Sequence, residues 1–560
     1  YNNTFSSTLP NQITIASTGR VEGRDQWHNA IVSMYGRTHV TNDGYILGAI
    51  KLGSSSSDPN LGVFTNNGTW VAGVNNVFSD NSLHNYGVIE IVQPTQIIGS
   101  LKHYAGGEIL FHLDPGVHFD QAALTVSGLA RLEGKITPVL DNLLPGEFRL
   151  LKAGTLESTA SIDDPFLFDW AQRITTDGEL RLSALADFRP AGSPLSGNQE
   201  QAAQYLERAW EAADPYLAGH FAYMLQMDSA AQHGGMLDAI GGAELLHQQG
   251  ATLQSIPTLL GEAIDCPMMG GAEVIVGEDS CAWMGVGRSW GRYTGKDTRR
   301  NDTDADLFSL GVQKEFRPGW FLSGVISRVS SDDGAATARS SGRSTIGSLG
   351  LKHQRGNWIL GASLAWGEGS YDSVRSFALP LAGGASSAPA ASLRSDSEMD
   401  IRALRARLSY EFDLEGWYLR PTLDVDALQT ETSGFDEESG EHLFRLSGDG
   451  DSKRQVVATP HVEIGSLFDL GGENRLRAYV DAGVRLAPDA DREMDVRISG
   501  ANTAIGYLRN RMDVPVATGL LKIGAQIYRD DALDLRLEYG LEANDDFRNE
   551  TATARVAWHF

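Results

Sequence analysis

Few residues of this chain have the type and spacing that chemistry requires. His112, Asp114 and His118 are close enough in sequence to hold a metal ion together, but loops between strands often contain such residues, and we expect these three to be loop residues. The acidic pair Glu437-Glu438 lies in a Gly- and Asp-rich stretch and is expected to be solvated. Residues 1–190 contain no Gly-x-Ser-x-Gly elbow or other serine-hydrolase motif. We therefore predict no catalytic residue, no metal site and no cofactor.

The two cysteines, Cys266 and Cys281, are separated by fifteen positions. A disulfide between them would stabilise the fold by about 3 kcal/mol in the chain-entropy model. Two free thiols without a role are the alternative. We favour the disulfide.

The totals exclude some classes of protein. The formal charge of −26 over 560 residues argues against nucleic acid as a partner, because that would require a basic surface. The sequence has no run of about eighteen apolar residues, so no transmembrane helix is expected. A closed barrel can still cross a bilayer, because its period-two pattern escapes a hydropathy average. The sequence begins Tyr1-Asn2-Asn3 without a signal segment, so we expect a processed or truncated chain.

Residues 274–560 alternate between apolar and polar side chains, as strands with two different faces do. In the last strand, one face carries Ala552, Ala554, Val556, Trp558 and Phe560. Charged residues such as Arg477, Asp481 and Arg485 occupy the opposite face of another strand. A soluble barrel would turn its apolar face inward, but a barrel of this size is too large to fill its own interior. We therefore predict apolar residues facing lipid and charges lining a wet lumen.

Twelve segments show this alternation, and each is long enough for a tilted membrane strand, which needs roughly 9–11 residues. Tight turns join some of them, and long polar loops at 372–396, 431–453 and 488–511 join others, as in outer-membrane barrels. The predicted strands are 280–293, 305–316, 318–330, 343–354, 356–371, 397–412, 415–430, 454–470, 473–487, 512–528, 531–543 and 549–560.

Residues 1–190 repeat a polar turn followed by a short apolar strand, at 42–46, 66–70 and 85–89. A period near twenty with one Asn- or Gly-containing corner per unit is typical of a stacked β-solenoid. A β-sandwich is the alternative. The segments 143–153 and 166–170 are heavier in aromatic residues and are expected to cap the stack.

Residues 191–273 read as a helical linker rich in Ala, Leu, Gln and Met. We expect Asn198 to cap its first helix, and breaks at Pro215, at Gly234-Gly235 and at Pro257. The predicted fold class is all-β: a right-handed parallel β-helix at 1–190, a short helical linker at 191–273, and a twelve-stranded antiparallel transmembrane barrel at 274–560.

This order of parts resembles the autotransporters, the monomeric type V secretion proteins of Gram-negative outer membranes. Residues 280–291 resemble the first barrel strand of the family, 304–313 and 319–324 its next hairpin, and 126–128 and 146–151 the C-terminal end of a pertactin-like passenger. The resemblance implies a pore helix before the first strand, expected near 255–264, and a passenger that crosses the membrane C-terminal end first. It also implies that the barrel-assembly machinery reads the final strand, here Val556, Trp558 and Phe560. Some members cut themselves at an Asn-Asn pair in the pore helix, which this linker lacks.

The resemblance places the chain in the outer membrane, with the passenger on the cell surface. Its implied partners are outer-membrane lipid and lipopolysaccharide, the barrel-assembly machinery, periplasmic chaperones, and a host or bacterial surface ligand. We expect an adhesin-like passenger. The alternatives are a membrane anchor for an enzyme whose catalytic part lies upstream of residue 1, and a general porin, which a helix in the lumen would obstruct.

Overall fold

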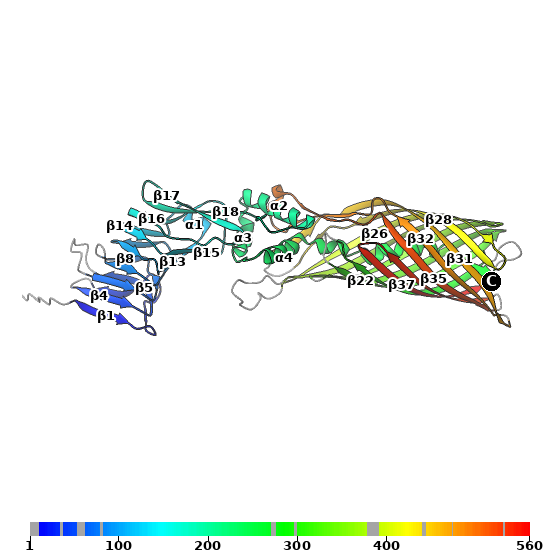
Figure 1. Cartoon of the computed structure of the whole chain (residues 1–560), viewed down its shortest axis with the longest axis horizontal. Coiled ribbons are helices and arrows are strands. Elements are labelled where there is room, and N and C mark those ends of the chain that lie inside the picture. Colours follow the sequence, from blue (N-terminus) through cyan, green and yellow to red (C-terminus); the bar gives the residue numbers. More distant parts are fainter. Residues whose placement is uncertain are drawn as a thin grey trace, which may run out of the picture.

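The protein is elongated, with a solenoid at one end, helices in the middle and a barrel at the other end (Figure 1). This computed structural model describes residues 10–33, 37–52, 62–78, 82–269, 276–295, 300–335, 337–377, 391–438, 444–472, 474–529 and 532–560. None of the helices in these ranges is both long and apolar enough to cross a bilayer.

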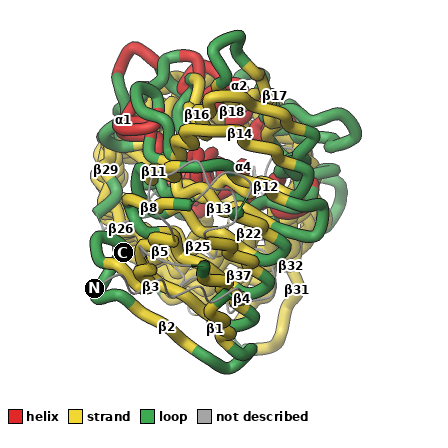
Figure 2. Tube along the Cα trace, turned by 90° about the vertical axis from the view of Figure 1, so that its left-hand side faces the viewer, coloured by secondary structure: helices red, strands yellow, loops and turns green. Residues whose placement is uncertain are grey.

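The N-terminal part is a β-helix, as predicted, and not a sandwich. Its strands pair in parallel with strands of the next coil, so that β1 stacks on β4, β4 on β6 and β6 on β9. Figure 2, viewed from the solenoid end, shows these coils in front of the barrel. The strands are β1 (Asn11–Ile15), β2 (Arg20–Glu22), β3 (Asn29–Ser33), β4 (Thr38–Asn42), β5 (Tyr45–Leu52), β6 (Gly62–Asn66), β7 (Thr69–Ala72), β8 (Asn75–Val77), β9 (Leu83–Asn85), β10 (Val88–Ile91), β11 (Thr95–Ile98), β12 (Leu101–His103), β13 (Glu108–Leu113), β14 (Leu124–Leu132) and β15 (Lys135–Leu140).

The repeated asparagines form a buried ladder through the solenoid. The Asn42 amide donates to the Asn66 carbonyl oxygen, and the Asn66 amide donates to that of Asn85, both at 2.7 Å. Asn85 then contacts the His103 ring at 2.9 Å, and burial lowers the pKa of His103. The ladder satisfies polar groups that each coil would otherwise bury unpaired. It explains why the sequence repeats at these positions.

The solenoid ends in an antiparallel cap. Strand β16 (Glu147–Ser158) continues the parallel stack beside β14 but pairs antiparallel with β18 (Glu179–Ala186), which also pairs with β17 (Phe168–Ile174). The fully buried Glu179 accepts hydrogen bonds from Arg149 and Arg181. This edge therefore accepts no further parallel coil and instead meets the helical linker.

The linker helices are α2 (Gly197–Glu211), η1 (Pro215–Leu217), α3 (Ala218–Met224), α4 (Ala230–Gly241), η2 (Ala243–His247) and α5 (Gly250–Glu262). The break at Pro215 is confirmed, since Pro215 opens η1. The other two predicted breaks are wrong, because Gly234-Gly235 lies within α4 and Pro257 within α5. Asn198 is not the cap: Ser196 caps α2 in a capping box with Gln199. Tertiary packing outweighs local propensity at these positions.

Twelve antiparallel strands close the barrel within the described residues, as predicted. The ring is completed by the pairing of β21 with β37 and of β26 with β28. The strands are β21 (Cys281–Tyr293), β22 (Asn301–Arg317), β23 (Trp320–Ala335), β24 (Ala338–Arg355), β25 (Trp358–Phe377), β26 (Ala391–Tyr410), β28 (Trp417–Thr432, extended by β27, Phe412–Asp413), β31 (Asp451–Gly471), β32 (Asn474–Leu486), β35 (Ala517–Arg529), β36 (Leu533–Ala543) and β37 (Phe547–His559).

The barrel turns its apolar face outward. Leu537 and Trp366 are 51% and 48% exposed, whereas Arg477, on the lumenal face, is 2% exposed. A surface of this kind is stable against acyl chains and not against water. The orientation predicted from the alternation is therefore confirmed.

Two of the long loops, expected to be merely polar, contribute to a second, smaller sheet. It consists of β29 (Phe435–Asp436), β30 (Leu446–Gly448), β33 (Arg492–Ile498) and β34 (Leu508–Met512). Leu446, Val496, Ile498 and Leu508 are each at most 1% exposed and belong to the same hydrophobic core as the solenoid and the linker. One core thus joins segments that lie far apart in the sequence.

Candidate functional site: the barrel lumen and its helix

Helix α5 lies inside the barrel, against the inner faces of β22 to β26 (Figure 1). Its buried residues Ile256, Leu259 and Leu260 pack against apolar lumenal side chains of the wall, among them Val329, Ile346, Ala365, Met399 and Ile401. The wall is therefore apolar where the helix touches it and polar elsewhere. The pore helix predicted near 255–264 exists, and it spans 250–262.

The end of α5 is held by small wall residues. The Ser363 hydroxyl donates to the carbonyl oxygen of Leu260 at 2.8 Å, and that of Ser323 donates to the carbonyl of Ala263. Carbonyls in the last turn of a helix have no partner within the helix, so the wall satisfies them here. A Cβ atom on Gly350 would lie 2.1 Å from the Ala263 carbonyl oxygen, so this approach requires glycine.

Charged groups fix the chain just beyond the helix. Arg536 donates to the Asp265 carboxylate at 2.7 Å, and Arg555 donates to the Asp265 carbonyl oxygen at 2.6 Å. These arginines come from the last two strands of the barrel, so a single residue ties the exit of α5 to the closing seam. No local pattern of residues indicates this contact.

The rest of the lumen is lined by paired charges. Arg405 contacts Asp424 at 3.0 Å, Asp481 contacts His461 at 2.8 Å, and Arg485 contacts Glu542 at 2.8 Å. Arg477 bonds to Glu463. The predicted lumenal placement of Arg477, Asp481 and Arg485 is confirmed. The Arg485–Glu542 pair reaches across β35, whereas the other pairs join neighbouring strands. Pairing reduces the cost of holding these charges inside the barrel.

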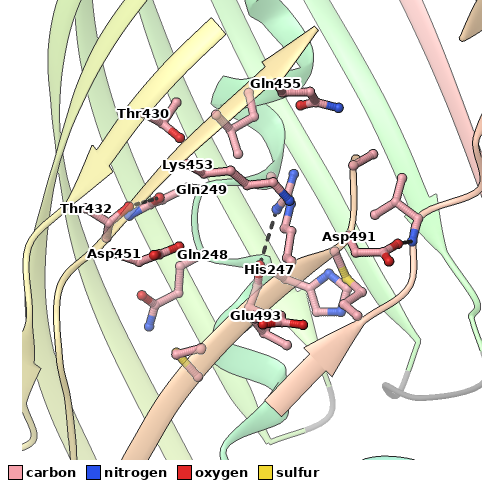
Figure 3. Close-up of a pocket in the computed structure, with 18 of the residues that line it drawn as sticks. His247, Gln248, Gln249, Thr430, Thr432, Asp451, Lys453, Gln455, Asp491 and Glu493 are labelled. Carbon is pink, nitrogen blue, oxygen red and sulfur yellow. Dashed lines mark hydrogen bonds between the residues drawn. The ribbon is translucent and has the colours of Figure 1, made fainter. Parts of the chain in front are cut away.

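A cavity of about 880 Å³ lies at the mouth of the barrel, between the start of α5 and the loop sheet (Figure 3). Gln249 accepts a hydrogen bond from Thr432 at 3.0 Å across one side of it. Lys453, Gln455, Asp491 and Glu493 line it as well. The lining therefore mixes acidic and basic side chains with amides.

Cys266 and Cys281 are joined by a disulfide, with Cα atoms 6.5 Å apart. The bond ties the exit of α5 to the first residue of β21. The hairpin of β19 (Pro267–Met269) and β20 (Val276–Glu278) lies within the closed loop. The disulfide therefore fixes the connection between α5 and the barrel wall.

The terminal strand β37 closes the barrel seam. Val556, Trp558 and Phe560 face outward, with Trp558 66% exposed. The Phe560 backbone N–H donates to the Ser280 carbonyl at 3.1 Å, and the Lys314 ammonium lies 4.9 Å from the centre of the Phe560 ring. The aromatic side chains are thus presented to the surroundings at the turn end of the barrel.

The remaining candidates lie apart from the lumen. Asp114 caps α1 (Pro115–His118), His118 accepts from the Asp114 backbone N–H at 2.9 Å, and His112 pairs with Glu90 at 2.8 Å. No cluster suited to a metal is found in the described ranges. The expectation that Glu437 is solvated is wrong, because it is 1% exposed and paired with Arg375, which the sequence did not reveal.

A closed barrel with an apolar outer belt, a charged lumen and a helix inside it defines an outer-membrane β-barrel. Residues 282–540 match the autotransporter β-domain family. Residues 282–540 therefore form an autotransporter β-domain, and this barrel lies in the outer membrane of a Gram-negative bacterium.

Three solved autotransporter barrels align with half of the chain or slightly more. The translocator domain of NalP from Neisseria meningitidis is 13% identical, covering 57% of this chain and 97% of its own, with a TM-score of 0.42. The transport unit of AIDA-I from Escherichia coli is 10% identical, covering 55% and 98%, with a TM-score of 0.34. The β-domain of BrkA from Bordetella is 14% identical, covering 50% and 100%, with a TM-score of 0.36. No curated protein sequence matches the chain significantly.

Proposed function

We propose that the barrel carries its own passenger, the β-helix of residues 1–190, to the cell surface through the lumen. The observation that supports this is α5 itself. It runs from the loop side of the barrel, where the linker and solenoid lie, toward the turn side, where β21 begins. A chain left in this position has the geometry of one that passed through the lumen and stopped.

The energy for this movement comes from folding outside the membrane. The solenoid buries large side chains in its coils, among them Phe64, Trp70, Phe111 and Phe148, each 0% exposed. Burial of each such side chain stabilises the folded solenoid by about 1.5–3 kcal/mol. A chain that is still unfolded in the lumen does not have this stabilisation. Stacking of coils outside therefore favours outward movement without a nucleotide fuel.

The partners follow from the same proposal. The exposed apolar belt contacts outer-membrane lipid and lipopolysaccharide. The barrel-assembly machinery and periplasmic chaperones bring the strands to the membrane, with Val556, Trp558 and Phe560 as the assembly signal. The passenger acts as an adhesin on a host or bacterial surface ligand, without catalysis.

A photo-crosslinking experiment tests the route. A photoreactive residue at Gln455, which lines the mouth cavity, should crosslink to passenger residues early after synthesis and only to linker or α5 residues later. The neighbouring Val456 is 57% exposed on the outer face and is the matched control, with no crosslink to the passenger. A passenger that reaches the surface without ever crosslinking to Gln455 would contradict the proposal.

A second candidate function is anchorage of an enzyme whose catalytic part lies upstream of residue 1. Adhesion assays separate the two. Cells displaying residues 1–560 should bind to host cells or to one another, and deletion of residues 10–190 should abolish the binding. Binding that persists after this deletion would argue against the adhesin.

A further inference from the structure

The sheet built from the surface loops has an apolar face that packs against the linker. Val496 and Ile498 of β33 and Leu508 of β34 are buried in the core that includes Leu206 of α2 and Leu237 of α4. All four strands of this sheet belong to the barrel half of the chain. The surface is therefore supplied by the barrel and covered by the exported part.

Backbone groups of the loops and the Asn510 side chain bind the linker helices directly. The Asn198 amide donates to the Arg511 carbonyl oxygen at 2.9 Å, and the Arg511 N–H donates to the Asn198 side-chain oxygen at 2.8 Å. Arg208 donates to the carbonyls of Ile505 and Tyr507 at 3.1 and 2.9 Å. Asn510, 0% exposed, donates to the Gly241 carbonyl at the end of α4. These bonds specify one orientation of the helices.

A buried ion pair joins the barrel wall, a loop and the linker at one point. Arg375, at the end of β25, donates to Glu437 at 2.8 Å and to the Phe444 carbonyl at 2.8 Å, and it also bonds to the Ala239 carbonyl of α4. Arg375 and Glu437 are 2% and 1% exposed. A charged group buried this fully requires all its partners, so the arrangement is complete only when α4 is in place.

The linker in turn supports the cap of the solenoid. The Leu143 N–H donates to the Ala218 carbonyl of α3 at 2.9 Å. Phe168 of β17 contacts Trp210 of α2 edge-on, with ring centres 5.6 Å apart, and Phe188 contacts Phe221 at 5.9 Å. The contacts therefore form one series from barrel to loops, linker, cap and coils.

We propose that the loop sheet is the docking surface on which the exported linker folds first, and that the folded linker then supports folding of the cap and the coils. This inference deepens the proposed function and rests on it. The linker lies nearest the mouth, and Leu206 and Leu237 of its helices are buried in the core that they share with the loop sheet. Because the docking surface belongs to the barrel, passenger folding begins as soon as residues 197–241 emerge.

The test compares loop variants with a variant of the coils, in cells whose barrel assembly is checked by heat-modifiable gel mobility. Val496→Asp places a charge on the buried loop face, while Asp495→Ala alters the other face of the same strand. The passenger of Val496→Asp should acquire protease resistance about tenfold more slowly than wild type, and that of Asp495→Ala at the wild-type rate. Acquisition at the wild-type rate by Val496→Asp would overturn the proposal.

Should Val496→Asp fail to assemble, Asn510→Ala and Asn198→Ala carry the same test, because they leave the apolar face intact. The order of folding is tested by Phe64→Asp in the coils. The linker and cap of this variant should still become protease-resistant, and a linker that stays sensitive would overturn the proposed order. Crosslinking at Gln455 separates these results from a failure of export, because it reports passage through the lumen whether or not the passenger folds.

Discussion

Arg536 of the barrel wall donates to Asp265 at 2.7 Å, directly after the helix that occupies the lumen. Both residues are at the turn end of the barrel, where the side chain of Arg536 is 7% exposed. The ion pair therefore holds the C-terminal end of α5 to the seam formed by β36 and β37.

Removing this pair should loosen the helix in the lumen. Asp265→Ala leaves Arg536 without this carboxylate partner and should cost about 1–3 kcal/mol of local stability. In planar bilayers we expect more frequent open-channel events than for wild type. Asp163→Asn, an exposed carboxylate of the solenoid, is the control and should behave as wild type. Equal conductance of Asp265→Ala and wild type would show that the pair does not hold the helix.

The asparagine ladder should contribute measurably to passenger stability. Asn66→Ala removes the acceptor of Asn42 and the donor to Asn85, leaving buried polar groups unpaired, and should destabilise the solenoid by about 1–3 kcal/mol. Asn67→Ala changes the next, exposed residue and should shift stability by less than about 0.5 kcal/mol. Urea unfolding followed by protease resistance measures both, and similar midpoints for the two variants would refute the role of the ladder.

The disulfide should stabilise the connection between α5 and β21. Thiol titration of unreduced, denatured protein should find no free thiol. Cys266→Ser should destabilise this loop by about 3 kcal/mol, so that the segment between α5 and β21 becomes sensitive to protease while the barrel remains assembled. Two titratable thiols in protein purified from the outer membrane would count against the bond.

The terminal aromatic should be required for assembly. Phe560→Asp places a charge where a ring faces the surroundings, and we expect it to abolish insertion into the outer membrane. Phe560→Trp keeps an aromatic group and is the control. Normal surface display of Phe560→Asp, measured by protease treatment of intact cells, would show that the barrel-assembly machinery does not require this residue.

Acid should weaken the linker. Burial lowers the pKa of His220 and of His233 from 6.5 to about 4, so both are neutral in the folded protein at pH 7. Their contribution to stability is complete above about pH 6.5 and is lost as the pH falls toward 4, because the unfolded chain binds the protons first. The denaturation midpoint of the linker should fall over this range.

His233→Phe should flatten this pH dependence, whereas His28→Gln, which changes an exposed solenoid histidine, should not. Hydrogen exchange of α3 and α4 between pH 7 and pH 4 provides the measurement. If hydrogen exchange depends on pH identically in wild type and His233→Phe, His233 does not cause the loss of stability in acid.

The segments with a regular local period could be predicted from the amino-acid sequence. Alternation along residues such as Leu533, Leu535 and Leu537 assigned both the strands and their outward face, because successive side chains of a strand point to opposite sides. The recurrence of Asn42, Asn66 and Asn85 revealed the solenoid for a similar reason: each coil presents the same corner to the next.

The conformation and burial of the irregular segments depend on long-range packing. Pro257 and Gly234 suggest breaks locally, yet the surrounding packing keeps both within helices. Glu437 in a polar loop looked solvated, but Arg375, 62 residues away, buries it. Contacts between segments so distant depend on how the whole chain folds, and no local pattern encodes them. The packing of the loop sheet against the linker helices is another contact between segments that are distant in the sequence.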